Sequence, residues 1–217
     1  KRCSALRYEV EGLIVTDDRN YSPREGERVV LLERWCAFPP DHPTTRLCLR
    51  LMKKAFSTSR VESLLDVGTG TGVLAIAGLK LGAKRAIAVD ISRIAAFSAS
   101  RNMRLNSLER QLEIRLGSID SVRGSFDLIV ANLLLSPLLQ LASGLRNLLS
   151  PAGVLILSGI YESELKSLET SLAKLGLERR EMITDIQYLA DCGSVTWAAA
   201  KFGACDSLHS AAGRRNI

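Results

Sequence analysis

The chain reads Leu64-Leu65-Asp66-Val67-Gly68-Thr69-Gly70-Thr71-Gly72, and apolar residues continue this stretch from Val73 to Ile76. The pattern predicts a buried strand, a glycine-rich turn and then a helix. Glycine is needed at such a turn because the backbone bends sharply and comes within contact distance of a ligand, where a Cβ would be in the way. The helix offers free backbone N–H groups and a positive dipole end to that ligand.

The spacing of the glycines excludes two common nucleotide-binding motifs. A dinucleotide fingerprint has glycines at its first, third and sixth positions, and counting from Gly68 the sixth position is Val73. A P-loop needs a lysine followed by serine or threonine, and none follows here. What remains is Asp66-x-Gly68-x-Gly70-x-Gly72, which resembles the first motif of S-adenosylmethionine-dependent methyltransferases of the Rossmann-like class.

The residue types of this motif suit the methionine part of that cofactor, which carries an ammonium and a carboxylate but no pyrophosphate. The acidic side chain suits the ammonium, and the backbone N–H groups of the turn suit the carboxylate. The cofactor-binding residues predicted in the turn are Asp66, Gly68, Thr69, Gly70 and Gly72.

The composition is that of one globular domain, with or without an appendage. The chain has 217 residues, of which 47% are hydrophobic and 24% charged, so it can bury a sizeable core. No apolar run reaches membrane-spanning length, because Ser and Pro interrupt residues 133–149, and no signal peptide opens the chain. We therefore expect no membrane partner.

The five cysteines form an odd set without a Cys-x-x-Cys pair, which predicts neither a disulfide framework nor a metal site. Such usage is typical of a reducing cytoplasm, the predicted localisation. The net charge of +6 mildly favours an acidic or nucleic-acid-rich partner, and an ordinary solvated basic surface explains it at least as well. Aromatic residues make up only 5% of the chain, so we expect no direct nucleic-acid readout.

Predicted strands and helices alternate through most of the chain. Strands are predicted near residues 63–67, 85–90, 111–116, 126–131 and 153–158, and helices near 43–57, 71–81, 92–105, 134–149 and 163–174, the first of them capped by Asp41. Such alternation implies right-handed crossovers and a parallel sheet. Residues 181–189 and 194–201 add an antiparallel hairpin. The predicted fold is α/β, a Rossmann-like seven-stranded methyltransferase sheet with five parallel strands and this C-terminal hairpin.

Three parts of the chain are predicted. Residues 1–40 form a small β-rich extension, 41–202 the methyltransferase domain, and 203–217 a flexible tail. In the extension, residues 8–15 and 28–35 are β-rich and strong turn signals separate them, which predicts a hairpin-like arrangement. The extension is either a lid or substrate platform, or it simply packs at the edge of the main domain.

Open parallel sheets bind ligands beyond the carboxyl ends of their strands, so the polar residues there are the next candidates. Asp90 ends the second parallel strand, where its carboxylate would hold both ribose hydroxyls and Ile91 would border the cofactor; a helix cap before Ser92 is the alternative. Ser118 and Ile119 follow the third strand and are candidates for hydrogen bonding to adenine and for packing on its ring. A simple turn explains these two residues nearly as well.

Asn132 ends the fourth strand, where the sulfonium and the methyl acceptor would meet. Its side-chain carbonyl can accept an N–H bond from an amine and so aim the amine's lone pair at the methyl group. Such a displacement needs mainly positioning and loss of a proton, so Asn132 is the predicted catalytic residue. Its alternative role is to cap the next helix.

Four segments of the chain resemble one particular family of methyltransferases. In chain order they are His42-Pro43-Thr44-Thr45-Arg46-Leu47-Cys48-Leu49, Leu65 to Ile76, Val130-Ala131-Asn132-Leu133-Leu134 and Leu155-Ile156-Leu157-Ser158-Gly159-Ile160. Together they resemble the ribosomal protein L-eleven methyltransferase family, of the PrmA type, and the His-Pro-Thr-Thr segment is the most specific of them. The resemblance implies an enzyme that uses S-adenosylmethionine, releases S-adenosylhomocysteine and methylates lysine side chains and the N-terminal amine of one ribosomal protein.

The resemblance also implies roles for single residues. Thr44 and Thr45 would border the cofactor, Asp90 would hold the ribose, and Asn132 would lie at the acceptor amine. His42 would be a general base or, in the interpretation that we favour, a residue of the helix start or of loop packing.

Two features depart from the family pattern. Relatives usually carry Gly-Thr-Gly just before the His-Pro-Thr-Thr segment, whereas this chain has Phe38-Pro39-Pro40-Asp41, which predicts a cofactor-facing loop of different shape. Full-length relatives also carry a separate N-terminal domain that recognises the ribosomal protein. The predicted function is an N-methyltransferase for a protein amine; the alternatives are a methyltransferase for a small molecule or RNA, and a non-catalytic cofactor-binding relative. The oligomeric state stays open.

Overall fold

The computed structural model describes residues 6–33, 38–189 and 193–205. Its centre is a seven-stranded sheet in the order β6-β5-β4-β7-β8-β10-β9. The strands are β4 (Ser63–Val67), β5 (Arg85–Asp90), β6 (Leu112–Leu116), β7 (Phe126–Asn132), β8 (Leu149–Tyr161), β9 (Leu177–Leu189) and β10 (Gly193–Ala204). The first five pair in parallel, and β10 pairs antiparallel with both β8 and β9. The predicted fold class is confirmed.

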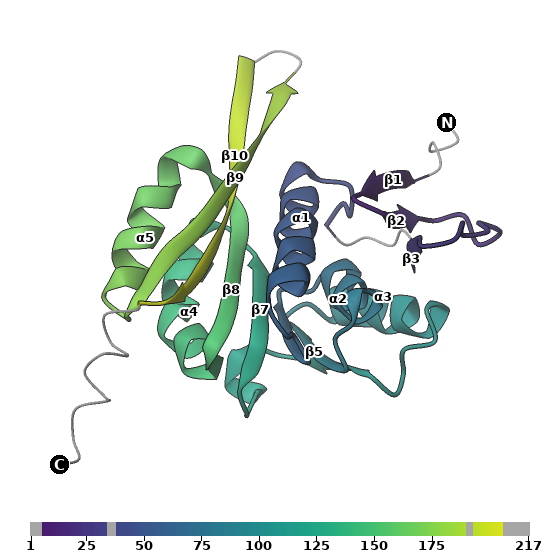
Figure 1. The fold of residues 1–217 in the computed structure, drawn as a ribbon, viewed down its shortest axis with the longest axis horizontal. Helices are drawn as coiled ribbons and strands as arrows, with labels where there is room; N and C mark the ends of the chain where they lie inside the picture. The colour runs from purple at the N-terminus through teal and green to yellow at the C-terminus, as the bar shows by residue number, and fades with distance from the viewer. Residues whose placement is uncertain (1–5, 34–37, 190–192, 206–217) are drawn as a thin grey trace.

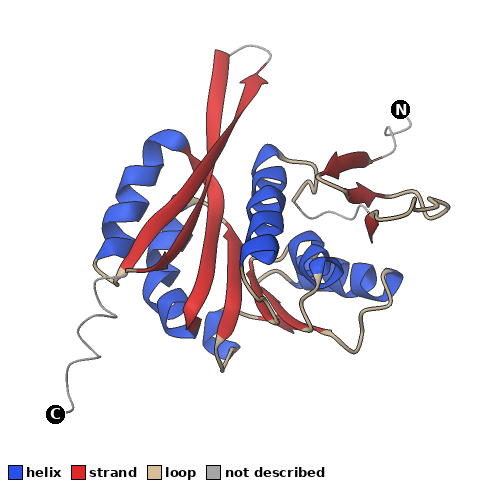
Figure 2. Cartoon of the chain, viewed as in Figure 1, coloured by secondary structure: helices blue, strands red, loops and turns tan. Residues whose placement is uncertain are grey.

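Helices cover both faces of this sheet (Figure 1). One face carries α1 (Pro43–Thr58), α2 (Val73–Leu81) and α3 (Arg93–Leu105), and the other carries α4 (Leu135–Leu148) and α5 (Leu165–Ala173). Two short 3-10 helices, η1 (Ile119–Ser121) and η2 (Glu162–Glu164), precede β7 and α5. Figure 2 shows the strands as a wall between the two sets of helices. Each face has its own layer of buried apolar side chains, as a parallel sheet covered on both faces requires.

The helix ends mostly follow the predicted signals. Ser92 caps α3 by accepting a backbone N–H bond at its Oγ, and Gly82 ends α2 with a φ of 126°. The cap of α1 differs from the prediction, because His42 and not Asp41 holds the cap position. The Nδ1 atom of His42 accepts the N–H of Thr44 at 3.3 Å, a group that Asp41, one residue earlier, does not bind.

The N-terminal sheet differs from the predicted hairpin. Residues 8–15 belong to two strands, β1 (Arg7–Val10) and β2 (Leu13–Thr16), which pair antiparallel around a turn at Glu11 and Gly12. β3 (Arg28–Leu31) then pairs with β2 in parallel. Both turn residues have positive φ, 49° and 82°, which is typical of a tight hairpin turn inside one apolar run. Residues 34–37 of the predicted second strand lie outside the described residues.

The last strand ends later than the sequence predicts. Gly203 and Ala204, assigned to the tail by the sequence prediction, extend β10 and lie opposite Glu178 and Leu177 of β9. Residues 206–217 of the predicted tail lie outside the described part of the chain.

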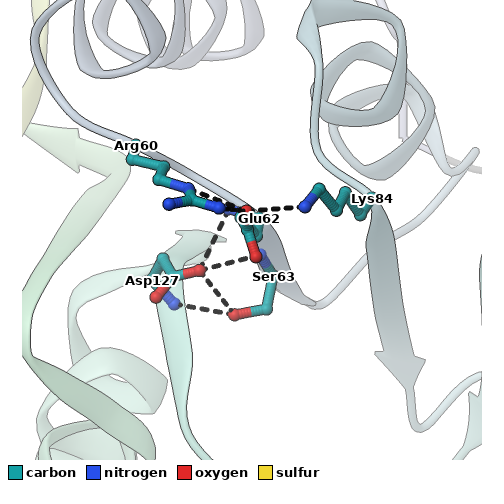
Figure 3. A network of polar contacts seen from close by, with 5 residues as sticks. All are labelled: Arg60, Glu62, Ser63, Lys84 and Asp127. Atoms are coloured by element: carbon teal, nitrogen blue, oxygen red, sulfur yellow. Dashed lines mark hydrogen bonds and ion pairs between the residues drawn. The ribbon is translucent and has the colours of Figure 1, made fainter.

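A polar cluster fixes the start of β4 beside the start of β7 (Figure 3). Asp127 Oδ2 accepts the N–H of Glu62 at 3.0 Å and both the N–H and the hydroxyl of Ser63 at 2.9 Å. Glu62 also pairs with Arg60 and Lys84. These groups lie at the amino ends of the strands, so they set the register of β4 and β7 there and leave the carboxyl ends for a site.

Candidate functional site

A cavity of about 750 Å³ opens at the carboxyl ends of β4, β5, β6 and β7. The predicted residues that line it are Thr44, Gly68, Gly70, Asp90, Ile91, Ser118 and Asn132. They come from α1 and from four strand ends, so the sheet topology brings together what the sequence separates. Open parallel sheets bind ligands at this position.

The glycine turn forms one wall of the cavity. Gly68, Gly70 and Gly72 all have positive φ, at 74°, 57° and 83°. The left-handed φ favours glycine at Gly68, and an added Cβ, 2.4 Å from Cδ2 of Leu133, would also displace the end of that side chain. The N–H of Gly68 donates to the carbonyl of Val89 at 2.9 Å, which ties the turn to β5.

Three predicted residues lie beside the cavity without lining it. Gly72 holds the N-cap position of α2, and a Cβ there would lie 3.2 Å from Cβ of Ala99. Thr69 and Thr45 line a smaller hollow of about 40 Å³ next to the cavity. These residues shape the turn and its surroundings.

Asp66 lies beneath the turn and does not line the cavity. It is 1% exposed, and its Oδ2 accepts the hydroxyl of Thr69 at 2.7 Å and the N–H of Ala75 at 3.1 Å. Burial raises the pKa of Asp66 to about 7, although these two hydrogen bonds act in the opposite direction. Asp66 joins the turn to α2 through these two bonds, and its predicted attraction of a ligand ammonium stays a prediction.

Asp90 ends β5 at the cavity. Its Oδ2 accepts the N–H of Gly70 at 3.0 Å, and its Oδ1 accepts the N–H of Ser92 at 2.8 Å. Each carboxylate oxygen keeps further acceptor capacity. Ile91 follows at the cavity and is 81% exposed, so a carboxylate and an apolar side chain lie next to each other there.

The two residues predicted to bind adenine both follow β6, but their side chains have different surroundings. Ser118 lines the cavity together with Gly117. Ile119 is buried, and a Cβ at Gly144 of α4 would lie 2.4 Å from its Cδ1. Ile119 therefore belongs to the core beneath α4 and lies outside the cavity lining, and its predicted packing on the adenine ring stays a prediction.

Asn132 ends β7 between the glycine turn and α1. Its Nδ2 donates to Oγ1 of Thr45 at 3.4 Å. Its Oδ1 is buried and has no hydrogen-bond partner among the described residues. Leaving such an acceptor unsatisfied costs about 1–3 kcal/mol, and the residue lines a cavity of ligand size. Asn132 Oδ1 is therefore an atom that a bound hydrogen-bond donor would satisfy.

An aromatic wall borders the same cavity, and the sequence prediction missed two of its residues, Trp197 and Tyr161. Phe38 and Trp197 both line it, and their rings lie 4.8 and 4.9 Å from the ring of His42. Trp197 also stacks on Tyr161 at 4.6 Å, and its Nε1 donates to Oε1 of Gln187 at 2.8 Å. We call Phe38, His42, Trp197 and Tyr161 the aromatic wall. No local signal marks Trp197, because only the antiparallel return of β10 brings it to the cavity.

His42 has a hydrogen-bonded ring within this wall. Its Nδ1 lies 2.8 Å from Oγ1 of Thr44 and accepts the N–H of the same residue. Burial lowers the pKa of His42, while the nearby Asp41 carboxylate raises it. Since Nδ1 is engaged at the helix start, this geometry supports the interpretation of His42 as a cap and packing residue.

The first turns of α4 form a further wall that the prediction missed. Leu134, Pro137 and Leu141 line the cavity, and Gln140 adds a polar side chain. Their spacing is that of one helix face, a signal that was available in the sequence. Among the described residues, no group of His, Cys, Asp and Glu has the arrangement of a metal site, and no helix is long and apolar enough to cross a membrane.

Comparisons with protein sequences give a consistent result. The profile described as ribosomal protein L11 methyltransferase (PrmA) matches residues 10–190. The ribosomal protein L11 methyltransferase of Listeria innocua is 36% identical over 167 residues, which cover 76% of this chain and 52% of that protein. The chain thus spans about half the length of the curated relatives that it matches.

Comparisons with solved structures agree. The ribosomal protein L11 methylase from Lactobacillus delbrueckii subsp. bulgaricus has a TM-score of 0.77 at 31% identity, and the match covers 90% of this chain and 96% of that one. A putative RNA methyltransferase from Pyrococcus horikoshii has a TM-score of 0.61 at 18% identity, over 73% and 84% of the two chains, and shares the fold alone. With its glycine turn, seven-stranded sheet and sequence match, this chain belongs to the ribosomal protein L11 methyltransferase (PrmA) family.

Proposed function

We propose that this chain is an S-adenosylmethionine-dependent N-methyltransferase whose acceptor is a protein amine. The observation that carries the proposal is the buried Oδ1 of Asn132, an unpartnered acceptor among the described residues. It belongs to a residue that lines one cavity with Asp90 and the glycine turn. Membership of a family described as ribosomal protein methyltransferases supports the reaction class.

The residues of the cavity fit S-adenosylmethionine. Asp90 would hold the ribose hydroxyls, Ile91 and Ser118 would border the adenine, and Thr44 and Gly68 would border the methionine part. The cavity, at about 750 Å³, is within the range of small-molecule sites. When bound, the cofactor supplies an electrophilic methyl group on a sulfonium.

Asn132 would position the acceptor amine. Its Oδ1 can accept one N–H bond from a neutral amine, which orients the lone pair on the same nitrogen. The bond from Nδ2 to Thr45 holds the amide so that the carbonyl is the free group. Positioning of a nucleophile accounts for roughly 7–11 kcal/mol of a reaction barrier at the upper limit. The nitrogen would gain the methyl group as the methyl–sulfur bond breaks and S-adenosylhomocysteine is released, and the methylated nitrogen, now cationic, would lose a proton to water with no strong base required.

The aromatic wall favours an amine acceptor. An amine nitrogen becomes cationic when it gains a methyl group, and the face of a tryptophan ring attracts a cation by about 0.5–2 kcal/mol. Trp197 lines the cavity that contains Asn132, and Tyr161 stacks on it. We propose a lysine side chain or an N-terminal amine of a ribosomal protein as the acceptor, in agreement with the names of the relatives, and the cytoplasm as its location.

Calorimetric titration with S-adenosylmethionine and S-adenosylhomocysteine tests the cofactor. We expect micromolar binding, a free energy of about −8 kcal/mol; absence of binding would contradict the proposal. Incubation of cell extract with methyl-labelled cofactor tests the acceptor. Label should enter protein, and mass spectrometry should find it on amine nitrogens. Label confined to RNA or to metabolites would support the alternative acceptors instead.

A further inference from the structure

Tyr8 of β1 connects the N-terminal sheet to the loop before α1. Its hydroxyl donates to the carbonyl of Pro40 at 2.6 Å, and the side chain is buried. Burial raises the pKa of Tyr8 well above its usual range, so the hydroxyl remains a donor at all working pH values. The Arg46 guanidinium lies 4.5 Å from the centre of the Tyr8 ring, and its Nε donates to the carbonyl of Asp41 at 3.3 Å.

The loop that Tyr8 holds borders the glycine turn. Phe38, Pro39 and Pro40 line the same small hollow as Gly70 and Thr71. Proline has no backbone N–H, so the two prolines can be anchored by backbone hydrogen bonds only through their carbonyls.

Those two carbonyls have separate partners. The carbonyl of Pro39 accepts the N–H of His42 at 3.2 Å, a bond within the loop itself. The carbonyl of Pro40 accepts the hydroxyl of Tyr8, a bond to a different sheet. Among the described residues, the Tyr8 bond therefore fixes the loop relative to the N-terminal sheet.

Asn102 of α3 makes a second connection, to the glycine turn itself. Its side chain is 0% exposed, its Oδ1 accepts the N–H of Glu33 at 2.7 Å, and its Nδ2 donates to the carbonyl of Thr71 at 2.9 Å. Asn106, one helical turn later, exchanges two hydrogen bonds with Leu31, at 3.0 and 2.7 Å. The buried amide of Asn102 thus joins the segment after β3 to the turn. The amide of Asn106 holds the strand and the backbone carbonyl of Asn102, at 2.8 Å, and has no bond to the turn.

From these contacts we infer that the N-terminal sheet is a positioning element of the cofactor cavity, with Tyr8 fixing the loop before α1 and Asn102 fixing the glycine turn. The inference rests on the proposed function, since the groups that the sheet positions are those that would meet the cofactor. It gives the extension a role other than lid, substrate platform or simple edge packing. A misplacement of about 1 Å at such groups costs on the order of 100-fold in rate.

The variant Tyr8→Phe tests the first connection, with Tyr21→Phe as its matched control. Phenylalanine keeps the ring beneath Arg46 and removes only the bond to Pro40. Tyr21 also donates one hydroxyl bond, to Oε2 of Glu27 at 2.7 Å, and neither residue lines the cavity. We expect the Kd for S-adenosylmethionine to rise roughly threefold to tenfold in Tyr8→Phe, the effect of one hydrogen bond, and to stay unchanged in Tyr21→Phe.

Asn102→Ala and Asn106→Ala form the second pair. Both variants lose bonds to the segment around β3, and only the first loses the bond to Thr71. Should Asn102→Ala fail to fold, Asn102→Leu keeps the volume of the side chain and also removes the donor to Thr71. Cofactor affinity should fall in the Asn102 variants by more than in Asn106→Ala.

Hydrogen exchange of the cofactor-free proteins decides the inference independently of binding. Amides of residues 41–45 should exchange faster in Tyr8→Phe, and amides of residues 68–76 should exchange faster in the Asn102 variants, with no such change in the two controls. Equal exchange within each pair would overturn the inference. A lack of cofactor binding by the unaltered chain, with these exchange differences present, would overturn the proposed function alone.

Discussion

The Oδ2 atom of Asp90 accepts a hydrogen bond from the backbone N–H of Gly70, with 3.0 Å between oxygen and nitrogen. A side chain at the end of β5 therefore holds the turn that follows β4, the neighbouring strand. The other oxygen of the carboxylate holds the N–H of Ser92 at the start of α3. The proposed ribose ligand thus also maintains the shape of the cavity.

Removing the Asp90 carboxylate should abolish cofactor binding. Hydrogen bonds to a charged group contribute about 1.5–3 kcal/mol each, so we expect Asp90→Ala to weaken the Kd for S-adenosylmethionine by at least about 100-fold. Asp90→Asn keeps one oxygen and should show an intermediate Kd. Calorimetric titration measures both variants, and Asp120→Ala, at an exposed position outside the cavity lining, is the control. Unaltered affinity in Asp90→Ala would exclude the ribose role.

Asn132→Ala should separate binding from transfer. The substitution removes the carbonyl that would orient the acceptor, while Asp90 and the glycine turn remain. We expect the Kd for the cofactor to stay within about threefold and the rate of methyl transfer to fall about 100-fold, the scale of a lost positioning contact. Titration and single-turnover transfer of labelled methyl measure the two quantities. Equal losses of cofactor affinity in Asn132→Ala and Asp90→Ala would refute this division of roles.

Gly68→Ala should destabilise the protein through contact with Leu133. Overpacking costs about 1–3 kcal/mol, and an L-residue in the left-handed region adds about 1–2 kcal/mol. The control is Gly12→Ala, because Gly12 has a φ of 82° and no atom within 4 Å of an added Cβ. Urea unfolding should give a larger loss of unfolding free energy for Gly68→Ala. Adding Leu133→Ala should recover part of the difference between the two variants.

Equal losses in Gly68→Ala and Gly12→Ala would mean that backbone strain alone makes glycine necessary in the turn. The close approach of Leu133 would then have no energetic role.

His42→Asn distinguishes a cap from a general base. Burial lowers the pKa of His42 in the folded state, so its contribution to stability is complete above the unfolded pKa of about 6.5 and is lost as the pH falls through the folded pKa. Asparagine is a good N-cap and does not titrate. We expect this variant to retain its unfolding free energy at pH 7 within about 1 kcal/mol, to lose this part of the pH dependence, and to transfer methyl within about threefold of the unaltered rate.

Urea unfolding between pH 5 and 8 and single-turnover transfer at pH 7.5 measure these quantities for His42→Asn. A loss of transfer of about 100-fold, with stability retained, would restore the general-base interpretation.

The fold and the centre of the site could be predicted because local patterns determine where each strand ends. Asp90 and Asn132 end β5 and β7, the parallel strands on either side of β4, and such ends converge on one edge. The alternation of strands and helices, read with Gly82 and Ser92 as helix ends, therefore located most of the cavity. The family resemblance of residues 42–49 also predicted Thr44 as a cofactor-binding residue, and Thr44 lines this cavity.

What could not be predicted depends on packing between distant segments. Trp197 reaches the cavity because β10 returns beside β8, and the residue has no local signal of function. Ile119 and Asp66 lie in predicted site segments, yet their side chains turn into the core. Which way a side chain points at a strand end or a turn depends on the elements that cover it, here α4 for Ile119 and α2 for Asp66.

The buried carboxyl of Asp66 should make the free energy of unfolding depend on pH. Burial raises its folded pKa from an ordinary value of 3.8 to about 7, so between these values the native chain holds a proton that the unfolded chain releases. The free energy of unfolding then falls as the pH rises. At 1.36 kcal/mol per pKa unit, the contribution present below pH 3.8 is lost by pH 7, by up to about 4 kcal/mol.

Asp66→Asn cannot ionise and keeps an oxygen for the bonds from Thr69 and Ala75. Urea unfolding at pH 4, 5.5 and 7 should therefore show the stability of the variant, relative to the unaltered chain, improving as the pH rises. Asp120→Asn, at an exposed site, is the control for the substitution itself. A difference that stays constant with pH would mean that Asp66 is already ionised in the folded protein. In that case a negative charge would lie beneath the glycine turn, as the attraction of a cofactor ammonium requires.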